Sequence, residues 1–451
     1  MKKIILTVIA VGIFLTACAP AAPNGQCSLY PSLASPEYPQ MSPYPDEMSY
    51  VDEKTGEFDD VGFSAVYDAW WEDRKAQYDQ PAGYANTLTG YFSKSIPEFL
   101  SGGDENSACS PLNIYMALAM LAEVTAGSSR QQILNLLASD SIEDLRTQAG
   151  YVWNAHYCAD GSSATLLANS LWLDEGLTYN SDTVQTLAES YFASVYQGPL
   201  GSADMNTALQ SWLNEQTGGL LKDQVQHVEM DPETVLALAS TICYRVKWSS
   251  EFIESRNSEG KFHAPNGDTD VTYMNTTLSY GPYYWDEMYA AVSLTLEDGG
   301  RMWLVLPDEG MTPAKLLEDG TALDMILNSS DTYENQKDIQ VNLSLPKFDI
   351  VSDMKLNEKL QNLGVTEVFG DGADFSPILP ENDAYLDSAQ HAARVAIDEE
   401  GITAAAYTVM IACGATMPPE DEVDFVLDRP FLFVITSRDG LPLFTGVVNQ
   451  P

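Results

Sequence analysis

Residue types that could perform catalysis are scarce in this chain. Its four histidines are His156, His227, His263 and His391. His156 and Cys158 stand two residues apart and could be metal ligands or a thiol–imidazole pair, but zinc takes four ligands and no second pair lies near them. No serine stands in the Gly-x-Ser-x-Gly motif of many hydrolases. We therefore expect no enzymatic activity, metal or cofactor, and an ordinary, partly buried His156 and Cys158.

The second candidate for a functional segment is an uncharged stretch near the C-terminus. Residues 401–419 carry no charged side chain, although the chain has 65 acidic and 22 basic residues and a net charge of −43. The stretch is too short, and too rich in Gly and Pro, to span a bilayer. Two readings remain: a permanently buried strand, or an exposed segment that is buried later.

The small residues of this stretch favour later burial. Residues 402–406, ITAAA, fill little core volume, and alanine has poor strand propensity. Small side chains suit a segment that must slide between two existing strands. One face of such a strand would carry Ile402, Ala404, Ala406, Thr408, Met410 and Ala412, and the other Thr403, Ala405, Tyr407, Val409 and Ile411. The first face can enter a core without burying the bulky Tyr407.

The overall composition indicates a folded, acidic protein. With 45% hydrophobic residues the chain can bury a sizeable core, which predicts one large domain or two smaller ones. Nucleic acid is excluded as a partner, because its phosphates require Lys and Arg to replace their counterions. The acidity favours basic protein partners.

The N-terminus predicts export. Lys2 and Lys3 precede an apolar run from Ile4 to Leu15, the layout of a secretory signal rather than of a membrane-spanning helix. The sequence LTAC, ending at Cys18, resembles the bacterial lipoprotein box. We therefore expect residues 1–17 to be a signal peptide and Cys18 to be lipidated, which gives a cell-surface lipoprotein held to the membrane by its lipid alone. The alternative is ordinary secretory cleavage beside an incidental Cys18.

The remaining cysteines exclude a complete disulfide framework. Cys27, Cys109, Cys158, Cys243 and Cys413 are five in number, so at least one thiol stays free or pairs between molecules. Cys413 lies within the uncharged stretch, where an exposed thiol could oxidise or cross-link.

Three segments follow the signal. Residues 18–60 are rich in Pro and acids, which predicts an extended tether. Residues 61–83 space Val66, Tyr67, Trp70 and Trp71 at helical intervals, and we expect a short extra helix that docks on the body. Residues 84–451 mix helical and strand patterns in one long domain, without a fixed-period repeat or a phosphate-binding loop.

Several elements of this domain can be predicted individually. A helix is expected to begin at Ser110–Pro111 and to end at Gly127, and a second capped helix is expected from Ser202. The sequences RMWLVLP and VNLSLPKF predict strands. Two apolar runs around Arg438, Asp439 and Gly440 predict a buried C-terminal hairpin.

The ordered combination of motifs from Tyr84 to Pro451 resembles the serpins, a family of serine protease inhibitors. EEGITAAAYT resembles the hinge of the serpin reactive-centre loop, and DFVLDRPFLFVI with LPLFTGVVNQP resembles the C-terminal hairpin. Further similarity lies in NSACSPLNIYMALAMLA, LASTICYRVKWSSEF, LPKFDI, LGVTEVF, ADFSPI and AQHAARVAIDEEG. The resemblance implies an α+β fold with a large mixed central sheet, additional sheets, eight or nine helices and an exposed loop near residues 399–420.

The resemblance also implies site residues. The hinge would comprise Glu399, Glu400, Gly401, Ile402, Thr403, Ala404, Ala405 and Ala406, and Trp248 would lie at the top of the sheet, in the region called the breach. The shutter, a polar cluster beneath the opening sheet, would comprise Ser110, Asn113, Ser240 and His391. Relative to the family pattern, one Ser has become Asn and one Asn has become Ser. Ile402 stands where serpins usually have Thr or Ser.

The implied mechanism is suicide inhibition by a monomer. A serine protease cleaves the loop and is acylated, and the loop then inserts into the sheet with the enzyme attached. The family's spacing from Gly401, and alignment from Pro418–Pro419, both place the scissile bond at Ala415–Thr416. Ala415 suits the small pocket of elastase-like or subtilisin-like proteases.

Two rival functions differ in class. A serpin fold could act as a non-inhibitory surface binding protein, which Ile402 and the altered shutter favour. A solute-binding lipoprotein of a transporter would fit the lipid box and tether, but it leaves the hinge and tail motifs unexplained.

Overall fold

The computed structural model describes residues 2–11, 30–52, 54–161, 163–329, 332–381, 383–402 and 421–451. These residues form two nine-stranded sheets and 11 α-helices, so the expected α+β fold class is confirmed. The helix number exceeds the eight or nine expected, because four-residue helices such as Lys222–Val225 (α8) form between longer elements.

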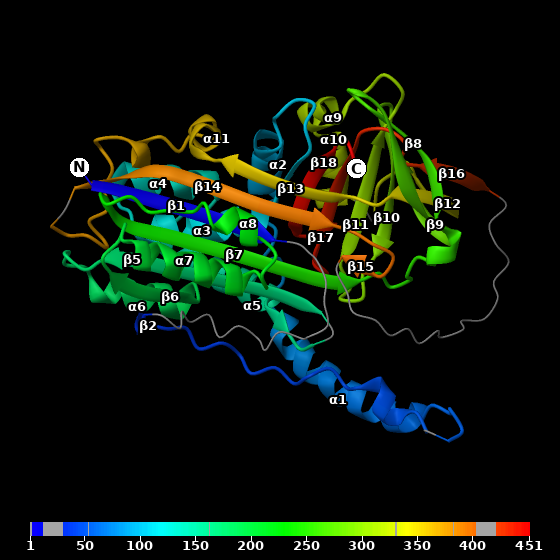
Figure 1. Ribbon diagram of the computed structural model, residues 1–451, viewed down its shortest axis with the longest axis horizontal. Coiled ribbons are helices and arrows are strands. Elements are labelled where there is room, and N and C mark those ends of the chain that lie inside the picture. The colour runs from blue at the N-terminus through cyan, green and yellow to red at the C-terminus, as the bar shows by residue number, and fades with distance from the viewer. Residues whose placement is uncertain are drawn as a thin grey trace.

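The first sheet is a mixed sheet that crosses the molecule (Figure 1). Its strands follow the order β13, β14, β1, β7, β5, β6 and β2, with β15 paired to β7 and β4 to β5. Their bounds are Asp349–Lys355 (β13), Ala384–Ala396 (β14), Lys2–Val11 (β1), Thr234–Lys247 (β7), Ala164–Asp174 (β5), Ala193–Gly198 (β6), Ser32–Ala34 (β2), Gly401–Ile402 (β15) and Cys158–Ala159 (β4). β1 runs parallel to both of its neighbours.

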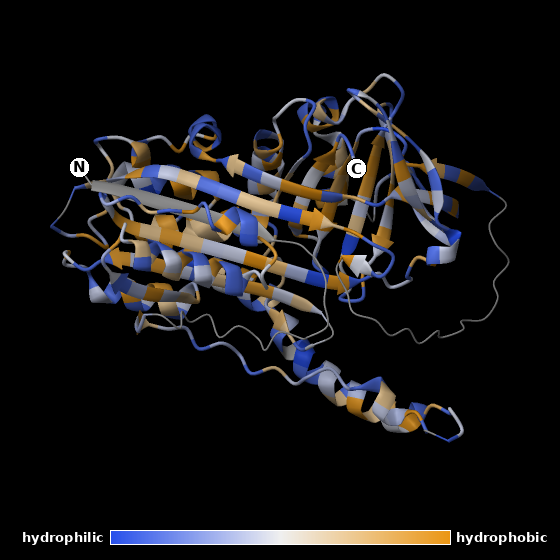
Figure 2. Ribbon diagram, viewed as in Figure 1, coloured by the Kyte–Doolittle hydropathy of each residue, from blue (hydrophilic) through white to orange (hydrophobic). Residues whose placement is uncertain are grey.

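The second sheet contains the C-terminal hairpin. Its order is β16, β12, β9, β10, β11, β17, β18 and β3, with β8 paired to β9. The bounds are Glu422–Val426 (β16), Gln336–Pro346 (β12), Gly267–Trp285 (β9), Tyr289–Thr295 (β10), Arg301–Pro307 (β11), Phe431–Thr436 (β17), Pro442–Val448 (β18), Ser107–Cys109 (β3) and Ser258–Ala264 (β8). All residues of β17 and β18 are buried, which confirms the predicted hairpin and the strands at β11 and β12. In Figure 2, much of the inner part of this sheet is orange, the colour of hydrophobic residues.

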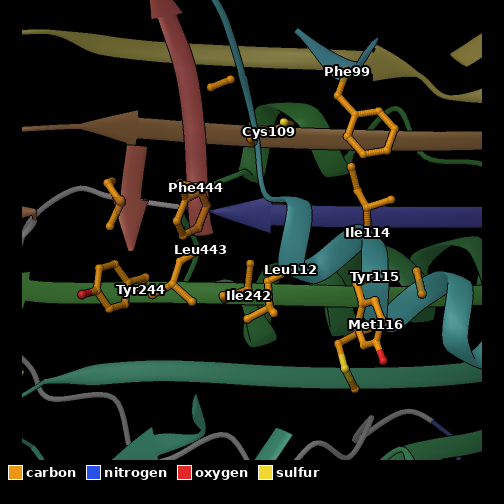
Figure 3. Close-up of a cluster of buried hydrophobic side chains, with 14 of the residues drawn as sticks. Phe99, Cys109, Leu112, Ile114, Tyr115, Met116, Ile242, Tyr244, Leu443 and Phe444 are labelled. Atoms are coloured by element: carbon orange, nitrogen blue, oxygen red, sulfur yellow. The ribbon is translucent and has the colours of Figure 1, made fainter. Parts of the chain in front are cut away.

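The helices pack around these sheets. Their bounds are Asp60–Tyr78 (α1), Leu88–Phe99 (α2), Pro111–Glu123 (α3), Gly127–Leu136 (α4), Ile142–His156 (α5), Ser181–Ser190 (α6), Ala203–Gln216 (α7), Lys222–Val225 (α8), Pro313–Asp319 (α9), Thr321–Asp324 (α10) and Asn357–Asn362 (α11). Every residue of α3 is buried, against β7, β1 and β18. Figure 3 shows Leu112 of α3 beside Ile242 of β7, and Ile114 of α3 near Phe99 of α2.

The end of α3 differs from the prediction. The helix stops at Glu123, and Gly127 begins α4 instead of capping α3. The Thr125 hydroxyl donates to the carbonyl of Leu121, and the Ala126 N–H donates to the carbonyl of Asp374, so other groups bind the chain where it leaves α3. The prediction for α7 is confirmed, because Ser202 caps its first turn.

The tether and the extra helix form an arm that reaches away from the body (Figure 1). Helix α1 is longer than the short helix expected, and aromatic contacts join it to the tether, for example Tyr44 with Trp70 at 5.0 Å between ring centroids. The tether is extended over most of its described length, but β2 pairs with β6 and a 3-10 turn forms at Glu47–Tyr50. β2 lies at the edge of the sheet, a position that a proline-rich segment can occupy.

The base of the arm is held by a buried arginine. Arg74 is 5% exposed, and its guanidinium lies 3.4 Å from the carboxylate of Asp160 and donates to the sulfur of Cys158 at 2.7 Å. Arg438, from the turn of the C-terminal hairpin, stacks over Trp71. Cationic side chains thus join α1 to both sheets.

The segment predicted as a signal peptide forms β1 in the intact chain. None of the helices among the described residues combines the length and the apolar character needed to cross a bilayer. The predicted removal of residues 1–17 concerns processing, and it stays a prediction. If it occurs, the central sheet loses one of its inner strands.

We predict that Arg74→Met weakens the attachment of the arm. The substitution removes the cation that compensates the buried Asp160, and disruption of a buried pair typically costs about 3–5 kcal/mol. Denaturant unfolding of the full chain should show this loss, whereas the neighbouring exposed Lys75→Met should change stability by less than about 0.5 kcal/mol. Equal stability of the two variants would contradict the role of Arg74.

Candidate functional site

The candidate site is the end of the central sheet where β14 leads into the hinge. β14 ends at Ala396, and after a short turn β15 runs back, antiparallel to β7, with Gly401 paired to Lys247 and Ile402 to Val246. Ile402 is 1% exposed. The hinge therefore starts as a short strand on β7.

A carboxylate shapes the hinge turn. One carboxylate oxygen of Asp398 accepts hydrogen bonds from the backbone N–H groups of Glu400 (3.0 Å) and Gly401 (3.1 Å). Burial raises the pKa of Asp398, and these two donors oppose that rise. An Asp that accepts from the backbone two residues ahead is typical of tight turns. The sequence prediction did not assign Asp398 to the site, although the pattern Asp-x-x-Gly is visible there.

Gly401 allows the hinge to approach β7. A Cβ atom at this position would lie 2.4 Å from the carbonyl oxygen of Val246 and 2.7 Å from the Cα of Lys247. Both are backbone atoms of a central strand, which cannot move aside as a flexible side chain can. The pairing of β15 with β7 therefore requires glycine at residue 401.

Trp248 fixes the hinge from the side of β7. It is 2% exposed, its indole N–H donates to the carbonyl of Asp398 at 2.8 Å, and its backbone N–H donates to the carbonyl of Glu400 at 3.1 Å. Phe252 packs edge-on against the indole and donates its backbone N–H to the carbonyl of Glu399. The structure thus brings the predicted breach residue and the hinge together.

Glu399 anchors the other side of the turn. Its carboxylate pairs with the Lys347 ammonium at 2.5 Å and accepts from the side-chain amide of Asn257 at 2.5 Å. Burial alone would raise the pKa of Glu399, but the hydrogen bonds from Lys347 and Asn257 outweigh it and hold the pKa below its usual value. The sequence prediction placed Glu399 outside the sheet and missed Asn257 and Lys347. Lys347 belongs to the quoted LPKFDI segment, but its partner could not be read from the sequence.

The four predicted shutter residues lie together beneath the sheet, all at most 1% exposed. The backbone N–H of Ser110 donates to Nε2 of His391 in β14 at 3.0 Å, and the Ser110 hydroxyl accepts from the backbone N–H of Asn113. The amide of Asn113 donates to the hydroxyl of Ser240 in β7 at 2.8 Å. The cluster therefore joins the start of α3 to the two strands that flank β1.

The exchange of Ser and Asn within the shutter keeps a hydrogen bond. Asn113 supplies an amide donor and Ser240 a hydroxyl acceptor, so the pair retains complementary groups. Because Ser110 donates to Nε2 of His391, the ring proton of a neutral His391 lies on Nδ1. The altered residues are therefore compatible with a connected polar cluster.

Other predicted site residues lie outside the described part of the chain. These are Cys18, residues 403–406 of the hinge, and Ala415 and Thr416. The cysteines Cys27 and Cys413 also lie outside it.

The described cysteines and His156 are buried side chains. Cys109, Cys158 and Cys243 are free and buried, and burial raises the pKa of each thiol. His156 is 6% exposed, and burial lowers its pKa to about 4. Within the described ranges, no group of three His, Cys, Asp or Glu side chains could hold a metal ion. These groups therefore serve the buried core.

The fold and the site define a protein whose central sheet leads into a hinge that is paired with the inner strand β7. A family model described as serpin (serine protease inhibitor) matches residues 92–451. The chain belongs to the serpin family. Members of this family generally act as inhibitors rather than as enzymes.

Individual relatives support this assignment. An uncharacterized serpin-like protein of Thermococcus kodakarensis is 29% identical over 80% of this chain and 84% of its own length. The leukocyte elastase inhibitor of Sus scrofa is 28% identical over 77% of this chain and 93% of its own length. The solved structure of the thermophilic serpin tengpin in its native state has a TM-score of 0.72 at 25% identity, and the match covers 83% of this chain and 95% of tengpin.

We predict that Gly401→Ala detaches β15 from β7. The added methyl group meets backbone atoms, and overpacking of this kind costs about 1–3 kcal/mol. Hydrogen exchange of the Gly401 and Ile402 region should become faster. The matched control is Gly102→Ala, at an exposed glycine whose Cβ would have no neighbour closer than 4.0 Å. Unchanged exchange in Gly401→Ala would show that the contact is relieved elsewhere.

We predict that the stabilising contribution of Glu399 depends on pH. Because the folded-state pKa lies below the ordinary value of 4.5, the ionised form favours folding; this contribution is present above about pH 4.5 and is lost as the pH falls through the folded pKa. Glu399→Gln should therefore be less stable than the parent at pH 7, and the difference should shrink at pH 3. Denaturant unfolding at pH 7 and at pH 3 measures the stability difference between the parent and the variant. An exposed control, Glu287→Gln, should change the free energy of unfolding at pH 7 by less than about 0.5 kcal/mol.

Proposed function

We propose that this protein inhibits serine proteases by the suicide-substrate route, in which a cleaved loop inserts into the central sheet. The observation that carries the proposal is β15, whose Ile402 is already buried and paired antiparallel with β7. Insertion of a serpin loop is itself a known case of strand addition. The hinge thus has the position and direction that further insertion requires.

The register of β15 assigns a partner to every later loop residue. Gly401 pairs with Lys247 and Ile402 with Val246, so the two residue numbers of each antiparallel pair add up to 648. The same sum pairs residue 414 with Thr234, the first residue of β7. Residues 401–414 would therefore match the whole of β7, and Ala415–Thr416 would follow directly beyond it. Fourteen residues at ~3.3 Å each would carry an attached protease about 46 Å.

The register also supports the predicted inward face. Residues that pair across antiparallel strands share a face. Ala404 and Ala406 would lie opposite Tyr244 and Ile242, which are both fully buried. Small loop residues opposite large β7 residues fit a core that is already filled. A larger residue at these loop positions would meet occupied space.

The chemical steps are those of an ordinary serine protease until deacylation. The protease serine attacks the carbonyl carbon of Ala415, the bond to Thr416 breaks, and the Thr416 amine leaves with a proton, so that an ester joins enzyme and inhibitor. Water would normally hydrolyse this ester. Loss of one oxyanion-hole donor slows a protease by about 10²–10³, or roughly 3–4 kcal/mol, so a modest distortion of the enzyme stalls this step.

The primary target class follows from Ala415. A small residue before the scissile bond fits a small primary pocket and offers no cation to an acidic one. Leukocyte elastase inhibitors of Sus scrofa and Mus musculus are among the relatives of this chain. We therefore propose elastase-like or subtilisin-like proteases as covalent partners of a monomeric inhibitor.

A binding function is the second candidate. The solved structure of human thyroxine-binding globulin in complex with its hormone has the same fold, with a TM-score of 0.68 at 20% identity. Ile402 at the first inserting position favours this candidate, because the β-branched side chain differs from the family's usual Thr or Ser. The two functions differ in whether cleavage of the loop raises the melting temperature.

The proposed location is the cell surface. Export by residues 1–17 and lipidation of Cys18 would leave the tether and the arm between the membrane and the serpin domain. The net charge of −43 is compatible with attraction to basic proteases.

The test is incubation of the processed protein with pancreatic elastase, subtilisin, chymotrypsin and trypsin, followed by denaturing gels. An SDS-stable complex with elastase or subtilisin, and release of a peptide beginning at Thr416 by mass spectrometry, are the expected results. Cleavage without any covalent complex would exclude inhibition. If the melting temperature also stays unchanged after cleavage, the binding function is favoured.

A charged residue on the inserting face provides a second test of the proposed insertion. Ala404→Arg would place an uncompensated cation opposite Tyr244, at a cost of several kcal/mol, so the loop should be cleaved without forming a complex. Ala404→Ser, which is small and uncharged, is the matched control and should retain complex formation. Complex formation by Ala404→Arg at the parent's level would show that the face assignment is wrong.

A further inference from the structure

The N-terminal strand β1 occupies the edge of β7 that the loop would need. β1 pairs in parallel with β7 from Lys3 opposite Thr234 to Val11 opposite Cys243. On its other side it pairs with β14 from Lys2 opposite Ala384 to Ile9 opposite Ala392. Figure 1 shows β1 between these two strands along most of their length.

The hinge and β1 share this edge end to end. On β7, Val246 and Lys247 pair with β15, and the pairing with β1 ends at Cys243. Tyr244 and Arg245 of β7 lie between these two paired segments. In the register of β15, loop residues 405–414 would pair with residues 243–234 of β7. The backbone groups on one edge of a strand can pair with one neighbouring strand at a time. Insertion beyond Ala404 and retention of β1 therefore exclude each other.

We propose that β1 silences the unprocessed chain, and that cleavage before Cys18 activates the inhibitor by releasing this strand. The proposal rests on the proposed function and on the predicted processing. Before export, the occupied gap would keep the chain from trapping proteases of its own cell. After export, the same cut that exposes Cys18 would open the gap.

The kinetics of inhibition explain why an occupied gap is sufficient. The acyl-enzyme either hydrolyses, which frees the protease and leaves a carboxylate on Ala415, or is trapped when the loop inserts. Displacement of β1 adds a barrier to insertion and leaves hydrolysis unchanged. More acyl-enzyme then follows the substrate pathway, and cleaved chain accumulates without complex.

Covalent attachment distinguishes the two states of β1. In the intact chain, β1 is covalently joined to the body through residues 12–29, so its return to the gap is an intramolecular step. Cleavage before Cys18 turns the strand into a free peptide that dilutes away. A parallel strand also pairs slightly less well per residue than an antiparallel one, which favours the loop once the connection is cut.

The test compares three full-length chains made by cell-free synthesis without membranes, so that residues 1–17 are retained. They are the parent, a Leu6→Pro/Val8→Pro variant, whose prolines cannot complete the hydrogen bonds of an inner strand, and a Leu6→Val/Val8→Ile control that keeps strand propensity. With pancreatic elastase, the proline variant should form about tenfold more SDS-stable complex per cleaved chain than the parent or the control. Formation of complex in equal, measurable amounts by all three chains overturns the silencing.

Two further measurements separate this proposal from the proposed function. Amide exchange of residues 2–11 should be slow in the parent, and fast exchange there overturns occupation of the gap. Cleavage of the loop should raise the melting temperature of the proline variant and leave that of the parent nearly unchanged; equal behaviour overturns the competition. If no chain forms a covalent complex but only the proline variant gains stability, competition for the gap is supported and inhibition is excluded.

Discussion

The edge of β7 that faces β14 is the constraint on which the structure depends. The opposite edge of β7 is occupied by β5, from Arg245 to Leu236. Buried backbone N–H and C=O groups must find partners, so this edge must be covered by an inner strand or by closure of the sheet. The hinge, the shutter and β1 all meet along it. β15 pairs with the last two residues of β7, β1 pairs with the residues from Thr234 to Cys243, and the shutter residue Ser240 belongs to β7 itself.

The hinge contacts determine how far the loop enters this edge at rest. Trp248 binds the carbonyls of Asp398 and Glu400, while Lys347 and Asn257 hold the carboxylate of Glu399. These contacts involve residues before Gly401, so the proposed extension of β15 would not break them. The turn is thus a fixed point from which the strand can lengthen. A fixed turn also sets the register, because a shift by one residue would move every side chain to the opposite face.

The sequence was sufficient for the parts of the site that rest on local pattern. The C-terminal hairpin follows from its apolar runs and turn residues, and it is confirmed. The hinge and shutter residues followed from the family motifs, and the structure places the four shutter side chains together. The partners Asn257 and Lys347 of Glu399 could not be predicted, because side chains far apart in sequence meet only in the fold. β1 was missed for another reason. An apolar run after two lysines fits both a signal peptide and a buried strand.

The shutter indicates why one gap can accept two different strands. Ser240 and His391 bond to residues at the start of α3, so these bonds do not depend on the strand between β7 and β14. Val8 of β1 pairs with both of them, and Thr408 would take the same place after insertion. Valine has no hydrogen-bonding side-chain group, whereas the threonine hydroxyl both donates and accepts. If the loop inserts as proposed, Thr408 would bring a hydroxyl to this position, where β1 has the apolar Val8.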